Sequence, residues 1–203
     1  MIARFAALLL FAAIAFAAPG SKRIVVLGDI IAAGYGVDPD EAYPAALQRK
    51  IDEAKLPYIV VNAGISGDTT AGGLRRIDWI LKQPLDILVV ELGGNDGLRG
   101  LPVSETRSNL QAIVDRTHAK YPNAKIVIAG MKMPANVGAQ YQSEFENVFP
   151  EIAKKNHAAL VPFVLENVGG KAELNQPDRI HPTPAGHEIV AENVWTVLKP
   201  LLK

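Results

Sequence analysis

An aliphatic run that ends in a Gly-Gly-Asn-Asp turn occupies residues 87–96 (ILVVELGGND). The run has almost no polar alternation, which is typical of a strand buried on both faces of a parallel sheet. Two more β-branched runs, residues 23–27 and 58–61, are also followed by loops of glycine and polar residues. The carboxyl ends of parallel strands meet at one edge of a sheet, where ligands bind. We therefore expect these three loops to form one site.

Longer helical patterns alternate with strands along the rest of the chain. Helices are expected over residues 42–54, 70–81, 104–121, 140–156 and 184–198, and further strands over residues 125–129 and 160–163. We expect Ser104 to cap its helix, because serine is a preferred N-cap residue. Alternating strands and helices predict one parallel sheet with right-handed crossovers and helices on both faces.

Composition and charge argue against several classes of protein. The chain has 203 residues, no cysteine and a formal net charge of zero, and this length favours a single domain. Balanced charge gives no long-range attraction to nucleic acid or anionic lipid, so we expect no nucleic-acid partner. Arg75 and Arg76 are adjacent in an expected helix, and we expect both to face water.

The N-terminal residues have the features of a signal peptide. Arg4 precedes an unbroken apolar run over residues 5–17, which ends in the small-x-small motif of residues 15–17. The run is shorter than the roughly 20 residues of a membrane-spanning helix. The sequence thus predicts a signal peptide over residues 1–17, one domain over residues 18–203, and a periplasmic or secreted protein without a stable membrane anchor after cleavage. An uncleaved membrane anchor is the alternative.

Four motifs fall at or near the predicted carboxyl edge of the sheet. They are residues 28–36 (GDIIAAGYG), 62–69 (NAGISGDT), 91–97 (ELGGNDG) and 178–182 (DRIHP). In this order they resemble the sequence blocks of the SGNH (GDSL) ester hydrolases, and most closely the periplasmic thioesterase–lysophospholipase branch, often labelled arylesterase. The resemblance implies the SGNH hydrolase fold, a flavodoxin-like three-layer α/β/α sandwich of about five parallel strands. It implies no cofactor.

The resemblance also implies roles for individual residues. His181 corresponds to the general base of the family, and Asp178 to the carboxylate that orients it, as in a Ser-His-Asp triad. The donors of the oxyanion hole correspond to the backbone N–H of Gly67, the side-chain amide of Asn95 and the backbone N–H of Ile30. A site of this kind takes a small ester, thioester or lysolipid-like molecule.

Ile30 departs from the family pattern, because the family has a nucleophilic serine at this position. An isoleucine side chain has no lone pair and no acidic proton, so it cannot form an acyl-enzyme. It is also bulkier than serine and would crowd the space of the scissile carbonyl. Ala32 departs as well, since a hydroxyl residue is common two positions after the nucleophile. We expect a catalytically impaired relative that still binds ester or acyl ligands.

An active ester hydrolase is the first alternative to an impaired one. Ser66, Thr69 or Thr70 would then replace the nucleophile, or His181 would activate a water molecule directly. Ser66 is the serine inside the motifs, but it directly precedes the expected donor Gly67.

A metal-dependent phosphoryl enzyme is the second alternative. Asp29, Asp68 and Asp96 follow expected strands, and carboxylates are ligands for divalent cations. The motifs account for all three residues without a metal. The sequence leaves the chain length of the ligand, its leaving group and the oligomeric state open.

Overall fold

The structure is a computed structural model that describes residues 20–202. The predicted signal peptide, residues 1–17, lies outside the described residues. Five parallel strands form one sheet in the order β2-β1-β3-β4-β5, which is the flavodoxin-like order. Their bounds are β1 Lys22–Gly28, β2 Tyr58–Asn62, β3 Ile87–Glu91, β4 Lys125–Ala129 and β5 Ala159–Val161.

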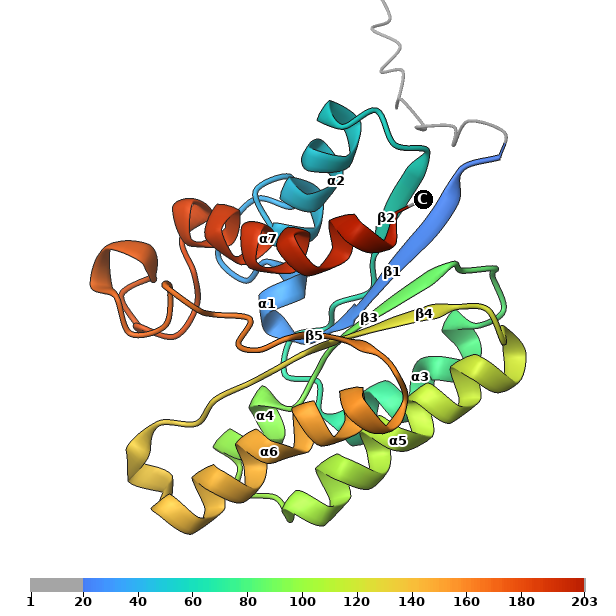
Figure 1. Ribbon diagram of the computed structural model, residues 1–203. Coiled ribbons are helices and arrows are strands. Elements are labelled where there is room, and N and C mark those ends of the chain that lie inside the picture. The colour runs from blue at the N-terminus through green and yellow to red at the C-terminus, as the bar shows by residue number, and fades with distance from the viewer. Residues whose placement is uncertain (1–19, 203) are drawn as a thin grey trace, which may run out of the picture.

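Helices cover both faces of the sheet and make a three-layer sandwich (Figure 1). One face carries α2 (Tyr43–Glu53) and α7 (Pro184–Leu198), which pack against each other. The other face carries α3 (Thr70–Ile80), α5 (Val103–Lys120) and α6 (Ala139–Lys155). The predicted α/β/α architecture is therefore confirmed. No helix in the described part of the chain is both long and apolar enough to cross a membrane.

The middle strand, β3, lies between β1 and β4, and all five of its residues are buried. Leu88 and Val89 are fully buried between the two helical layers, as the missing polar alternation predicts. Glu91 is also fully buried at the end of this strand. Burial of a carboxyl group is costly unless the group is neutral or hydrogen-bonded. Glu91 therefore needs partners at the carboxyl edge of the sheet.

Several local predictions are wrong or incomplete. Ser104 does not cap α5, because the helix begins one residue earlier, after Pro102, without a side-chain cap. Two short helices, α1 (Ile30–Ala33) and α4 (Gly94–Leu98), lie inside loops that the sequence analysis left irregular. Short 3-10 turns complete the chain at η1 (Ala135–Val137), η2 (Ala172–Leu174) and η3 (Lys199–Leu201).

Candidate active site

The loop after β1 places Ile30 at the carboxyl edge of the sheet. Oδ1 of Asp29 accepts the backbone N–H of Ile31 at 3.0 Å and caps α1. The Ile30 side chain is half-buried and packs against the core. Its backbone N–H has no acceptor among residues 20–202, so it is free to donate to a ligand.

Two buried carboxyl groups, those of Asp29 in this loop and Glu91 at the end of β3, accept backbone N–H groups of the loop. Oε2 of Glu91 accepts the backbone N–H groups of Asp29 at 3.3 Å and Ala32 at 3.2 Å. Burial raises the pKa of Asp29 to about 6 and raises the pKa of Glu91 well above its ordinary value. The burial of Glu91 therefore favours its protonated form. Its Oε1 has no hydrogen-bond partner among the described residues.

The loop after β2 presents a second free backbone donor. Gly67 has a φ of 76°, a left-handed conformation that favours glycine. Its carbonyl oxygen accepts Nη2 of Arg99 at 2.9 Å. Its N–H has no acceptor in the part of the chain that the structure describes. The predicted donor Gly67 is thus available.

The Asn95 side chain connects the first two loops. Its Nδ2 donates to Oδ2 of Asp29 at 3.2 Å and to the carbonyl oxygen of Asp68 at 2.9 Å. Asp29 directly precedes Ile30, and Asp68 directly follows Gly67. The amide of Asn95 therefore lies beside both backbone donors, but it must turn from these protein acceptors before it can donate to a ligand.

The loop before α7 brings a histidine and a carboxylate together. Nδ1 of His181 lies 2.7 Å from Oδ2 of Asp178. Oδ1 of Asp178 accepts the backbone N–H groups of Ile180 at 2.9 Å and His181 at 3.0 Å. The backbone N–H of His181, together with its ring and the N–H of Ile180, lowers the pKa of Asp178 to about 2. Asp178 is therefore ionised, and it orients the His181 ring.

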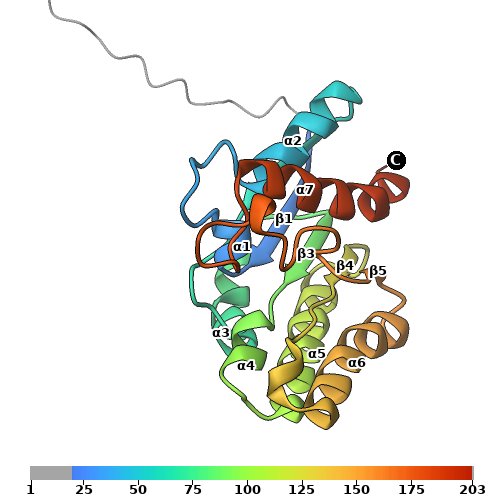
Figure 2. The same cartoon turned by 90° about the vertical axis from the view of Figure 1, so that its left-hand side faces the viewer.

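This histidine loop is attached to the loop after α1. Nε2 of Gln176 donates to the carbonyl oxygen of Tyr35 at 2.6 Å, and the Gln176 backbone N–H donates to the His181 carbonyl oxygen at 2.7 Å. The rings of Tyr35 and His181 pack with their centroids 4.9 Å apart. Figure 2 looks onto this edge, where α1 and the loop before α7 lie side by side.

Arg76 is a residue of the site that the sequence analysis missed, and the prediction that it faces water is wrong. Its Nε lies 2.7 Å from Oδ2 of Asp68, and the guanidinium also donates to the carbonyl oxygens of Ala63 at 2.6 Å and Gly28 at 3.0 Å. Arg75 is exposed as expected. Helical spacing could have found Arg76, since it lies three and four residues after buried glycines of α3.

The three aspartates of the metal alternative have separate partners. Asp68 pairs with Arg76, Asp29 accepts from Asn95, and Asp96 accepts the backbone N–H of Thr70 at 2.9 Å. No group of three or more His, Cys, Asp or Glu that could hold a metal occurs within residues 20–202. The arrangement gives a divalent cation no shared site.

The alternative hydroxyl nucleophiles differ in accessibility. The Thr69 hydroxyl caps α3 by accepting the Gly72 N–H at 3.2 Å, and the Thr70 hydroxyl donates to Asp96. Both threonines are buried, whereas Ser66 is exposed. Ser66 is therefore the one of these three residues whose hydroxyl is open to solvent.

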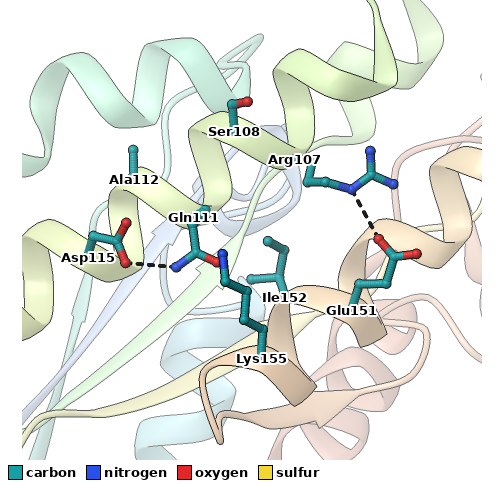
Figure 3. Close-up of a pocket in the computed structure, with 8 residues that line it drawn as sticks. All are labelled: Arg107, Ser108, Gln111, Ala112, Asp115, Glu151, Ile152 and Lys155. Carbon is teal, nitrogen blue, oxygen red and sulfur yellow. Dashed lines mark hydrogen bonds and ion pairs between the residues drawn. The ribbon is translucent and has the colours of Figure 1, made fainter.

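A hollow lies between α5 and α6, away from the motifs (Figure 3). Arg107 pairs with Glu151 at 3.0 Å, and Gln111 donates to Asp115 at 2.7 Å. None of the residues that line it belongs to the four motifs. Its contacts are those of a solvated groove between two helices.

An α/β sandwich with a His–carboxylate pair and unpaired backbone donors at the carboxyl edge of its sheet has the layout of an ester hydrolase. Comparison with known proteins agrees with this class. The model of the GDSL-like Lipase/Acylhydrolase family matches residues 26–189. The chain therefore belongs to the GDSL-like lipase/acylhydrolase family of ester hydrolases.

Individual relatives are similar over nearly their whole length. Esterase TesA of Pseudomonas aeruginosa is 42% identical over 90% of both chains. Thioesterase 1/protease 1/lysophospholipase L1 of Escherichia coli (strain K12) is 38% identical over 92% of this chain and 88% of the relative. A crystal structure of TesA superposes with a TM-score of 0.85 at 41% identity and covers 89% of this chain and 100% of that one.

Proposed function

We propose that this chain binds ester, thioester or lysolipid-like acyl ligands at the carboxyl edge of its sheet and hydrolyses them poorly, because Ile30 occupies the nucleophile position. The observation that carries this proposal is the place of Ile30, directly after the capping residue Asp29 and at the start of α1. The names of the relatives, which include an esterase and a thioesterase–lysophospholipase, support this class of ligand.

The remaining groups fit the binding and polarisation of an acyl carbonyl. The free N–H groups of Ile30 and Gly67 donate to the carbonyl oxygen, and Asn95 joins them once its amide turns toward the ligand. His181, held by Asp178 at 2.7 Å, is the base that would remove a proton from a nucleophile. Ile30 offers no proton and no lone pair, so the reaction stops at the bound ester.

A slow hydrolase is the second candidate function, and the intact His181–Asp178 pair favours it. In this route His181 takes a proton from water, and the hydroxide attacks the carbonyl carbon while the two backbone donors hold the carbonyl oxygen. The C–O or C–S bond to the leaving group then breaks, and His181 returns the proton to the departing alcohol or thiol. Ser66 is a further nucleophile candidate because its side chain is exposed. Both routes use the same edge of the sheet as the binding function.

We also propose that the protein acts outside the cytoplasm. Arg4 and the apolar run over residues 5–17 support export. N-terminal sequencing of the protein recovered from the periplasm or medium tests this, and a mature chain that still begins at Met1 contradicts it.

The test of the proposed function compares the unmodified chain with Ile30→Ser and Ile30→Ala on short and medium acyl p-nitrophenyl esters. Ile30→Ser supplies the nucleophile and clears space in one step, so we expect kcat/KM to rise by roughly 10³-fold or more. Ile30→Ala clears the space alone and should stay near the unmodified chain.

Two controls make the result decisive. Ile30→Ser combined with His181→Ala should lose the gain, because the serine then has no base. If folded Ile30→Ser remains at background, the proposed role of Ile30 is wrong. If the unmodified chain already matches Ile30→Ser and Ser66→Ala abolishes its activity, the second candidate function replaces the first.

A further inference from the structure

The guanidinium of Arg76 contacts the two loops that carry the proposed backbone donors. It bonds to the carbonyl oxygen of Gly28 at the end of β1, to the carbonyl oxygen of Ala63 after β2, and to the carboxylate of Asp68. Gly28 lies two residues before Ile30, and Asp68 lies one residue after Gly67. One side chain on α3 thus reaches both loops.

We propose that Arg76 is a positioning residue that sets the spacing between the backbone N–H groups of Ile30 and Gly67. This inference rests on the proposed function, which assigns both N–H groups to the carbonyl oxygen of the ligand. Arg76 itself touches neither donor and acts through Gly28, Ala63 and Asp68. Donor position matters because a displacement of about 1 Å can cost about 10²-fold in rate.

Two backbone hydrogen bonds and the side chains of Asn62 and Asn95 also join the two loops. The N–H of Ile65 donates to the carbonyl oxygen of Gly28 at 3.1 Å, and the N–H of Ala63 donates to that of Val26 at 2.9 Å. Gly28 therefore accepts from both Ile65 and Arg76. After Ile65 the chain turns through Gly67, and the ion pair between Arg76 and Asp68 holds the residue that follows Gly67.

The acceptor Asp68 is itself fixed in place. A Cβ built on Gly72 would lie 1.6 Å from Oδ1 of Asp68, so this carboxylate sits directly against the backbone of α3. Its Oδ1 also accepts the N–H of Thr69 at 3.1 Å. The side chains of Arg76 and Asp68 are 18% and 11% exposed, and a partly shielded pair keeps more of its attraction than an exposed one.

Arginine suits this role better than lysine. Its planar group carries five N–H donors in a rigid fork and can bond in three directions at once. Here Nε, Nη1 and Nη2 each have a different acceptor. A lysine ammonium can keep the attraction to Asp68, but it cannot hold Gly28 and Ala63 in the same fixed geometry.

The first experiment measures amide hydrogen exchange by NMR in the full chain with Ile30 retained. In Arg76→Met we expect the amides of Ile65 and Asp68 to exchange at least about tenfold faster, while amides of β3 keep their rates. Arg75→Met is the matched control and should change neither set. Arg76→Lys should fall between Arg76→Met and the unmodified chain.

The second experiment measures kinetics in the Ile30→Ser background. Adding Arg76→Met should lower kcat by about 10–100-fold with KM changed less than about threefold, because donor spacing acts on the transition state. Arg76→Lys should recover part of the loss, and Arg75→Met should cost nothing. A residue with only a structural role would lower Tm and active fraction without this split between kcat and KM.

Failure of this inference can be told apart from failure of the proposed function. An inactive Ile30→Ser contradicts the proposed function, yet the exchange experiment still decides whether Arg76 holds the two loops. Unchanged exchange at Ile65 and Asp68 overturns the inference, and so does equal acceleration at β3. If Arg76→Met does not fold, Arg76→Lys and Arg76→Gln are judged by the same two readouts.

Discussion

Oε2 of Glu91 accepts the backbone N–H of Ala32 at 3.2 Å, so the end of β3 fixes the short helix that presents Ile30. The other carboxyl oxygen of Glu91 is buried and has no partner among the described residues. A Cβ built on Gly28 would lie 2.4 Å from Cβ of Ala32 and 2.5 Å from Oε2 of Glu91. The side chains of Ala32 and Glu91 therefore border the same small space.

A serine at position 32 should stabilise the protein. Its hydroxyl would lie near the Glu91 carboxyl group, and one hydrogen bond there contributes about 0.5–1.5 kcal/mol. Ala32→Thr should instead cost about 1–3 kcal/mol, because its extra methyl enters a fully buried position. Urea unfolding of both variants checks this, and a less stable Ala32→Ser would contradict it.

Replacement of Glu91 should show how much its hydrogen bonds to the backbone contribute to stability. Glu91→Gln keeps an oxygen for the N–H groups of Asp29 and Ala32, whereas Glu91→Leu leaves both without an acceptor. We expect Glu91→Leu to lose about 2–6 kcal/mol at pH 7, at about 1–3 kcal/mol for each of the two unsatisfied groups, and Glu91→Gln to lose far less. Equal losses in a denaturation series would show that the two bonds contribute little.

The carboxyl groups of Asp29 and Glu91 make the stability of the folded chain depend on pH. Burial raises the folded-state pKa of Asp29 to about 6 and that of Glu91 further above its usual range, so the folded chain binds more protons than the unfolded one. This contribution to stability is fully present below about pH 4 and is lost as pH rises through 6 and beyond. As pH rises from 5 to 8, the stability of Glu91→Gln should therefore increase relative to that of the unmodified chain. An unchanged difference across that range would contradict it.

His187 makes stability depend on pH in the opposite direction. It is almost fully buried, its Nδ1 accepts the backbone N–H of Tyr43 at 3.3 Å, and burial lowers its pKa from 6.5 to about 4. The folded chain then binds fewer protons, so stability is present above pH 6.5 and is lost as pH falls through 4, by roughly 3 kcal/mol in total. His187→Asn keeps an acceptor for Tyr43 and should remove this loss. The exposed His157→Asn should leave it unchanged in urea titrations at pH 4.5 and pH 7.5.

The sequence predicted the architecture because the strands and long helices carry their own periodicity. It missed α1 and α4, since helices of four and five residues show no repeat. The raised pKa of Glu91 and the burial of His187 follow from packing between distant segments, which local composition does not show. Arg76 was misassigned because a charged residue on a helix usually faces water, and its three acceptors lie in other parts of the chain.

The hydrogen bond between Asp178 and His181 should control the activity of the protein in the Ile30→Ser background. Asp178 uses Oδ1 for two backbone N–H groups and Oδ2 for His181. In Asp178→Asn the amide oxygen can keep both backbone bonds, so the loop should keep its shape. The amide nitrogen would then face Nδ1 of His181 and favour the tautomer with its proton on Nε2, which cannot act as the base. We expect kcat to fall by about 10⁴-fold with Tm nearly unchanged.

Asp178→Ala separates this effect from the loop itself. It removes both the backbone bonds and the carboxylate, so it should lower Tm as well as kcat. The exposed Asp52→Asn on α2 is the control and should leave both quantities unchanged. Because the pKa of Asp178 is lowered to about 2, its carboxylate stays ionised at every pH from 4 to 8, and loss of activity on acidification in that range must come from another group. If Asp178→Asn keeps more than about a tenth of the kcat of Ile30→Ser, where about 10⁴-fold loss is expected, Asp178 does not set the tautomer of His181.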